Sequence, residues 1–379
     1  MRALPTAAAP VLPRRNVAPR RLVRRIPISL VVALLGVGCA GRPATTELPL
    51  VTTTLTVTPP ATRTPGAAST AEPPGPTPPP PDRFEAELRP GIEPAGYLED
   101  ACEAMRLRWN PDGSAPGTVV LPIMFHSIRE PERMVADNVT VSTEYFEATI
   151  ALAQSLGFET ITSEELLSFL TQNARIPPRS MMLIVDDRRP GVIAEYVLPV
   201  AEAYDWTVTL GWIIGDTRPS LWATMETLAE SGRLDVQSHG LNHVYVVDGM
   251  SDEEMREEIS GAIPILEEHF GYRPTAYVWP GGNFNRRSVE IAREAGFRLG
   301  FTAFSRGPLL FDWIPLGPEE QAVGDPLMVL PRAWSPSATA NLVQAAELGD
   351  QAAEFARANR TTEEAWYRHA CGGELFAAA

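Results

Sequence analysis

The sequence contains no lysine. All 32 basic residues are arginine, against 47 acidic residues, which gives a net charge of -15 at pH 7. The missing lysine excludes Schiff-base enzymes and nucleotide-binding proteins that need a Walker-type phosphate lysine. Residues 1–38 hold seven of the arginines and no acidic residue, so the rest of the chain is more acidic still. Such a surface repels phosphate backbones, and we expect no nucleic acid partner.

Cysteine is scarce as well, with three residues in the chain. The first, Cys39, follows an arginine-rich start and an apolar run at residues 26–38 that is too short to span a bilayer. Residues 35–40, LGVGCA, resemble a bacterial lipobox, in which the cysteine becomes the lipidated first residue of the mature protein. The sequence therefore predicts a signal peptide over residues 1–38 and an exported lipoprotein on the outer face of the bacterial cell membrane. An ordinary signal peptide or a short anchor, with an extracellular protein, stays open as the alternative.

The other two cysteines, Cys102 and Cys371, lie near the two ends of the remaining chain. An even pair in an exported protein favours a disulfide, and no zinc-type cysteine spacing is present. We therefore predict a disulfide between Cys102 and Cys371, with two buried free thiols as the alternative.

Proline is distributed unevenly. Twelve of the 37 prolines fall within residues 43–82, together with a run of threonines. Such a segment cannot bury enough apolar surface to fold. We predict that the lipidated cysteine and a disordered stalk occupy residues 39–83. An N-terminal extension at 84–118, a main domain at 119–340 and a C-terminal helical extension at 341–379 would follow.

From residue 118 onward, short apolar runs alternate with amphipathic helical patterns. We expect one helix with a continuous apolar stripe from Ser251 to Phe270, and strands near residues 119–125, 181–185, 207–214, 234–237, 275–279, 299–303 and 328–330. This alternation predicts parallel strands with helices packed outside them, in a barrel or an open sheet. In both folds the chemistry collects at the carboxyl ends of the strands.

Five reactive side chains follow those strands directly, namely His126, Asp186, Asp187, His239 and His243. Two imidazoles at i, i+4 and one carboxylate form a ligand set for a divalent metal that leaves open positions. A metal lowers the pKa of a bound water to about 7. Of two adjacent aspartates, one can hold the metal while the other takes the proton of the water. His126 is the available acid for the leaving group.

Taken singly, these residues have simpler explanations. An aspartate pair after a strand often forms a turn or a helix cap. The two histidines could be surface residues on one helical turn, and His126 could be a partly buried side chain without a catalytic role. Their coincidence at one edge of the sheet favours the metal site.

Several motifs resemble those of the polysaccharide deacetylases, carbohydrate esterase family four. LIVDDRRP at 183–190 is similar to the family's Thr-Phe-Asp-Asp-Gly motif, SHGLNH at 238–243 to its His-Ser/Thr-x-x-His motif, and VWPGGNFN at 278–285 to its third motif. LPIMFHSI at 121–128 and DPLMVLPR at 325–332 are similar to the opening and closing segments of the branch that deacetylates poly-N-acetylglucosamine. The resemblance implies an α/β fold, the incomplete (β/α)7 barrel of the polysaccharide deacetylase type.

The resemblance also implies a role for each site residue: Asp186 as general base, His126 as acid, Asp187, His239 and His243 as metal ligands, and the backbone N–H groups of Gly281 and Gly282 at the oxyanion. The expected cofactor is a divalent metal, with zinc as the default and cobalt, nickel, iron or manganese as alternatives. The implied reaction is metal-dependent removal of N-acetyl or O-acetyl groups from a cell-surface or extracellular polysaccharide of the N-acetylglucosamine type.

Two positions depart from the family pattern. Arg188, followed by Arg189, stands where the family has glycine, and a cation beside a metal ligand competes with a divalent ion. Gly240 replaces the usual serine or threonine between the histidines. Two alternatives therefore stay open. One is a glycan-binding surface lipoprotein with weak or no catalysis, in which Arg188 fills the catalytic pocket, and the other is a hydrolase of the same barrel that acts on a smaller amide or ester.

Overall fold

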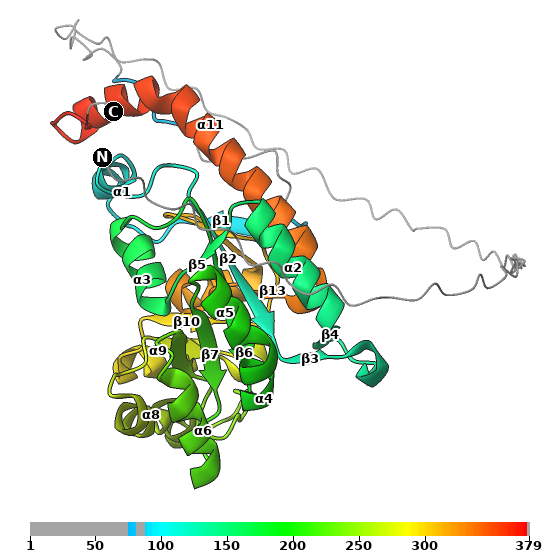
Figure 1. Cartoon of the computed structure of the whole chain (residues 1–379). Coiled ribbons are helices and arrows are strands. Elements are labelled where there is room, and N and C mark those ends of the chain that lie inside the picture. The colour runs from blue at the N-terminus through cyan, green and yellow to red at the C-terminus, as the bar shows by residue number, and fades with distance from the viewer. Residues whose placement is uncertain (1–74, 81–87, 377–379) are drawn as a thin grey trace, which may run out of the picture. The chain divides into compact units, whose positions relative to one another are not determined.

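The computed structural model describes residues 75–80 and 88–376 of the chain (Figure 1). The predicted signal peptide, the lipidation site Cys39 and most of the predicted stalk lie outside the described residues. None of the described helices has the length and apolar character needed to cross a membrane.

A curled, mainly parallel sheet forms the centre of the domain. Its strand order is β10-β9-β8-β7-β6-β2-β11, with β13 also paired to β2 and β5 paired to β6. The strands are β2 (Val119–Phe125), β5 (Glu159–Thr160), β6 (Arg179–Asp186), β7 (Val208–Trp212), β8 (Leu234–Ser238), β9 (Ala276–Val278), β10 (Leu299–Phe301), β11 (Leu309–Leu310) and β13 (Ala333–Trp334). All of these pairs are parallel except β11, which runs antiparallel to the start of β2. The sheet forms the incomplete barrel that the family resemblance implies.

The gap in the barrel lies between β10 and β13. Leu330 makes a single parallel bridge to Phe301 of β10, and Ala333 pairs with Ile123 of β2. The residues between Leu330 and Ala333 therefore reach from one edge of the sheet to the other. We call residues 330–334 the closing segment, and its Arg332 is almost completely buried.

Helices cover the outside of the sheet (Figure 1). They are α1 (Ala101–Arg108), α2 (Thr143–Ser155), α3 (Ser163–Gln172), α4 (Pro190–Val192), α5 (Leu198–Tyr204), α6 (Pro219–Ala229), α7 (Asp252–Ser260), α8 (Ala262–Phe270), α9 (Arg286–Ala295), α10 (Pro318–Val323) and α11 (Ala338–Ala370). The small strands β3 (Ser127–Arg129) and β4 (Thr140–Ser142) pair with each other beside the barrel.

Both faces of the sheet are buried, as the apolar strand patterns predict. Along β2, Val119 and Leu121 pack in one cluster with Phe146 of α2 and Leu342 of α11. Val120, on the opposite face, belongs to a second cluster that includes Met182 and Ile184 of β6. This alternation, with helices outside and side chains inside, is typical of parallel sheets.

Two predicted elements differ from the structure. The helix expected from Ser251 to Phe270 is two helices, α7 and α8, which meet at Gly261. Pro264 has no N–H to donate to the carbonyl of residue 260, and this breaks the hydrogen-bond ladder there. The strand expected at 328–330 is also wrong, because Pro326–Met328 forms a 3-10 turn and Leu330 makes a lone bridge.

The segments on either side of the barrel pack against it and against each other. β1 (Glu93–Ala95) pairs antiparallel with β12 (Ile314–Leu316). Helix α1 lies against α11, and a disulfide between Cys102 and Cys371 links their ends. The two cysteines thus form the bond expected from their number and position.

Removing this disulfide should lower the free energy of unfolding by about 3–5 kcal/mol, because the bond restricts the unfolded chain over a long loop. The two cysteines are 269 residues apart. Urea unfolding of the oxidised protein and of the Cys102→Ala/Cys371→Ala variant would measure the difference. A reducing agent should destabilise the former and leave the variant unchanged. Equal midpoints for the two oxidised samples would show that the bond contributes nothing to stability.

Candidate metal and catalytic site

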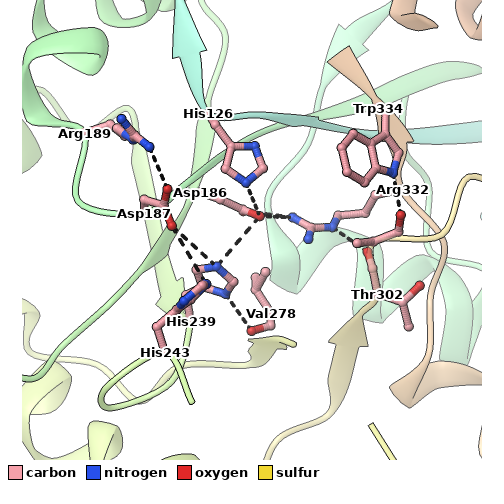
Figure 2. Close-up of polar contacts among 11 residues, drawn as sticks. His126, Asp186, Asp187, Arg189, His239, His243, Val278, Thr302, Arg332 and Trp334 are labelled. Carbon is pink, nitrogen blue, oxygen red and sulfur yellow. Dashed lines mark hydrogen bonds and ion pairs between the residues drawn. The ribbon is translucent and has the colours of Figure 1, made fainter. Parts of the chain in front are cut away.

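The five residues singled out in the sequence meet at the carboxyl ends of β2, β6 and β8 (Figure 2). They line one cavity of about 240 Å³, together with backbone of the loop after β9 and the side chains of Tyr245, Arg332 and Trp334. The strand order explains the convergence, because β2 and β6 are adjacent and β7 alone separates β6 from β8. All three histidines predicted at this rim lie there.

Asp187, His239 and His243 face a common point. Their ligand atoms all lie within 4.8 Å of one another. Nε2 of His239 and Nε2 of His243 are each 3.9 Å from Oδ1 of Asp187. Two nitrogens and one carboxylate oxygen at these separations fit a single divalent ion.

The ring of His239 is held in the orientation that a ligand needs. Its Nδ1 lies 2.8 Å from the carbonyl oxygen of Val278. A carbonyl can only accept, so Nδ1 carries the hydrogen and the lone pair of Nε2 faces Asp187. Burial lowers the pKa of His239 to about 4, against the opposing charge of Asp186. The ring is therefore neutral at pH 7, as metal binding requires.

Asp186 has a different environment from its neighbour. Its carboxylate accepts two hydrogen bonds from Nη1 of Arg332, at 2.8 and 2.9 Å, and both side chains are almost completely buried. Burial raises the pKa of Asp186, but the charges of Arg332, His239 and His126 outweigh it and bring the pKa to about 2. Asp186 is therefore an ionised carboxylate beside the three ligands, as expected of a base.

Arg332 is the site residue that sequence reasoning missed. Besides binding Asp186, its Nε donates to the carbonyl of Thr302 at 2.7 Å. The segment DPLMVLPR contains it, but nothing in the sequence connects that arginine to Asp186. The signal that could have been used is a lone arginine in an apolar run, since a buried cation needs a buried anion.

His126 lies beside Asp186. Its Nε2 is 3.8 Å from Oδ2 of Asp186, and 17% of its side chain is exposed. Burial lowers the pKa of His126, while Asp186 and Asp187 oppose that effect. Within the described residues its Nδ1 has no hydrogen-bond partner. The structure thus pairs His126 with Asp186, and its role as an acid stays a prediction.

The cation that contacts Asp187 is Arg189, and not the preceding Arg188. Its Nη2 lies 2.9 Å from Oδ2 of Asp187, the oxygen opposite the one that faces the histidines. Arg188 does not line the site cavity. Asp187, not Arg188, has the left-handed backbone, with φ of 68°. The expectation that Arg188 crowds the site is therefore wrong, because Arg189 binds Asp187 from outside and leaves Oδ1 free.

The two glycines assigned to the oxyanion behave differently. The N–H of Gly282 donates to the carbonyl of Trp279 at 2.8 Å, which closes the turn after β9. It is therefore not available to an oxyanion, and that assignment is wrong. Gly281 has φ of 63° and lies under the ring of Tyr245. Within the described residues its N–H has no protein acceptor, so Gly281 remains the candidate donor.

Known proteins are similar to this chain in sequence and in fold. A sequence model of the polysaccharide deacetylase family matches residues 173–300. The candidate polysaccharide deacetylase YxkH of Bacillus subtilis is 24% identical over 188 residues, which cover 48% of this chain and 64% of that protein. The Streptococcus pyogenes deacetylase PplD, solved in complex with acetate, superposes with a TM-score of 0.51 at 20% identity, over 61% of this chain and 99% of that chain.

The family match contains both aspartates and the two histidines that follow β8, while His126 and Arg332 lie outside it. The superposition covers 61% of this chain, a larger share than the family match, and shows that the two chains have the same fold. The sheet topology, the site geometry and the sequence match agree, and the chain therefore carries a polysaccharide deacetylase domain.

Proposed function

We propose that this chain is a metal-dependent hydrolase that removes acetyl groups from a polysaccharide of the N-acetylglucosamine type. One observation carries the proposal, which is the meeting of Asp187, His239 and His243 around one point with the ionised Asp186 beside them. Hydrolysis of an amide needs an activated water, a base and an acid. The family resemblance is the reason for proposing a polysaccharide substrate. The motifs at 121–128 and 325–332 favour a polysaccharide of the N-acetylglucosamine type.

A divalent ion held by these three ligands would polarise the acetyl carbonyl and acidify water. Asp186 is placed to accept the proton of the attacking water. His126 is placed to give a proton to the departing nitrogen as the C–N bond breaks, which leaves acetate and a free amine on the sugar. The N–H of Gly281 can donate to the carbonyl oxygen as it gains negative charge.

Removing the metal should abolish acetate release from N-acetylglucosamine oligomers. We expect a chelator to reduce the wild-type rate to background and zinc or cobalt to restore it. His239→Ala should be inactive under all of these conditions. His269→Ala is the matched control, because His269 pairs with Glu226 away from the site and should turn over normally. Wild-type activity that survives complete chelation would contradict the proposal.

A second candidate is a glycan-binding protein without turnover. The ion pair between Arg189 and Asp187 favours it, because the guanidinium withdraws charge from a metal ligand. Wild-type protein that binds both zinc and the oligomers but releases no acetate would support this alternative.

We further propose that the protein is exported and anchored on the outer face of the bacterial membrane through Cys39. The disulfide supports an oxidising compartment, since such bonds are rare in the cytosol. Labelling with a radioactive fatty acid, lost on Cys39→Ala, would test the anchor.

A further inference from the structure

The loop that carries His243 has an unusual backbone. It runs from the end of β8 to the start of α7, and three of its residues have positive φ: Gly240 (82°), His243 (61°) and Gly249 (90°). Such a conformation is costly for a non-glycine residue and persists only when the surroundings hold it. Contacts outside the loop must therefore fix the position of His243.

The end of β7 holds one side of this loop. The N–H of Ile214 donates to the carbonyl of Gly240 at 3.2 Å, and the N–H of Gly215 donates to the carbonyl of Leu241. These bonds satisfy carbonyl groups of the loop and leave its N–H groups facing the other way.

Glu258 of α7 takes up those N–H groups. Its Oε2 accepts from the N–H of Asn242 at 2.9 Å, and its Oε1 accepts from the N–H of Val244 at 3.0 Å. The N–H of His243, between them, also hydrogen-bonds to the carboxylate. Three successive amides thus surround one carboxylate, with His243 in the middle. The backbone carbonyl of Glu258 also accepts a hydrogen bond, from the N–H of Leu241 at 2.9 Å.

The burial of Glu258 indicates that its role is to bind the backbone amides of the loop. The residue is 3% exposed, and its carboxylate oxygens accept from the backbone N–H groups of Asn242 and Val244. Burying a carboxylate is unfavourable unless hydrogen bonds compensate it, and an apolar residue would suffice to pack α7. The compensation here comes from the amides of the loop.

Gly240 and Glu258 depend on each other. A Cβ at position 240 would overlap Oε1 of Glu258, and the hydroxyl of Tyr277 would lie 3.2 Å from it. The carboxylate therefore occupies the space that a side chain at 240 would need. It cannot move aside without breaking its bonds to Asn242 and Val244.

We propose that Glu258 is a positioning residue that holds His243 in place for metal binding. The proposal rests on the proposed function in so far as His243 is a metal ligand. It assigns the bracing of the second histidine to a buried carboxylate that lies 15 residues further along the chain, on α7.

The test compares metal affinity among Glu258 variants, measured by zinc competition on purified metal-free protein. Glu258→Ala should weaken affinity about 10–100-fold, the usual effect of losing a group that orients a ligand. Glu258→Gln should be intermediate, because its amide replaces one of the two acceptor oxygens with a donor. Glu257→Gln is the matched control, since Glu257 is exposed on the same helix and should bind zinc normally. Folded Glu258→Ala protein with wild-type affinity would overturn the proposal.

A double-mutant cycle keeps the test decisive if truncation at 258 impairs folding. Gly240→Ala alone should weaken zinc binding by displacing Glu258, whereas in the Glu258→Gln background the same change should cost less. The backbone strain of a residue at φ of 82° is present in both backgrounds and cancels. Additive effects of the two changes on affinity would contradict the proposed coupling.

Two outcomes separate this proposal from the proposed function. If zinc affinity depends on Glu258 but the wild-type protein releases no acetate, the positioning role stands and the hydrolase proposal fails. If the wild-type protein releases acetate and Glu258→Ala retains both zinc affinity and turnover, the hydrolase proposal stands and the positioning role fails.

Discussion

Replacing Asp186 with asparagine should lower the turnover of acetate release by about 10²–10⁴-fold, the usual effect of removing a general base. Metal binding should remain, because Asp186 lies outside the set formed by Asp187, His239 and His243. Its carboxylate is bound to Arg332 instead. Acetate release and zinc affinity, measured on the same preparation, would separate the two effects.

Asp187→Asn is the comparison that makes this result interpretable. Asp187 is the adjacent aspartate, and its substitution should weaken zinc binding as well as turnover. Loss of zinc binding in Asp186→Asn would mean that Asp186 is a ligand, and wild-type turnover in that variant would mean that it is not the base.

Replacing Arg332 with methionine should destabilise the protein by about 3–5 kcal/mol, because it leaves the buried Asp186 carboxylate without its partner. Arg332 and Asp186 are both about 1% exposed, so water cannot replace the lost interaction. The free energy of unfolding from urea denaturation measures the loss. Turnover should fall too, since nothing else in the described residues holds Asp186 by two hydrogen bonds.

Two further variants test whether the loss of stability in Arg332→Met comes from breaking the buried ion pair. Arg256→Met removes an arginine from an exposed pair with Glu294, and should cost no more than about 1 kcal/mol. The double variant Asp186→Asn/Arg332→Met removes both buried charges and should recover part of the stability lost in Arg332→Met. If Arg332→Met were as stable as Arg256→Met, the buried pair would not contribute as described.

The grouping of the candidate site residues at one rim of the sheet was predictable because the signal is local. A polar residue directly after an apolar strand must lie at the carboxyl end of that strand, and parallel strands bring those ends together. His126, Asp186 and His239 were found in this way. The same alternation predicted parallel strands with helices outside them, while the choice of a barrel over an open sheet came from the family resemblance.

Other features depend on contacts between residues far apart in the chain, and no local pattern identifies the partner. Arg332 is 146 residues from Asp186, and it reaches that carboxylate because the closing segment crosses from β10 to β2. The loss of Gly282 as a donor follows from a hydrogen bond within a turn whose geometry a sequence motif does not specify. Glu258 reads as an ordinary surface residue of a charged helix until the loop folds onto it.

The closing segment completes the candidate site with residues from near the end of the domain. It comes after every metal ligand in the chain, so a copy cut or halted before residue 332 would still contain both histidines and both aspartates. Such a fragment would lack the cation that keeps Asp186 charged and oriented, and also β13, which pairs with β2. Under the proposed function, we therefore expect nascent or clipped chains to release no acetate from glycans until the last part of the barrel is in place.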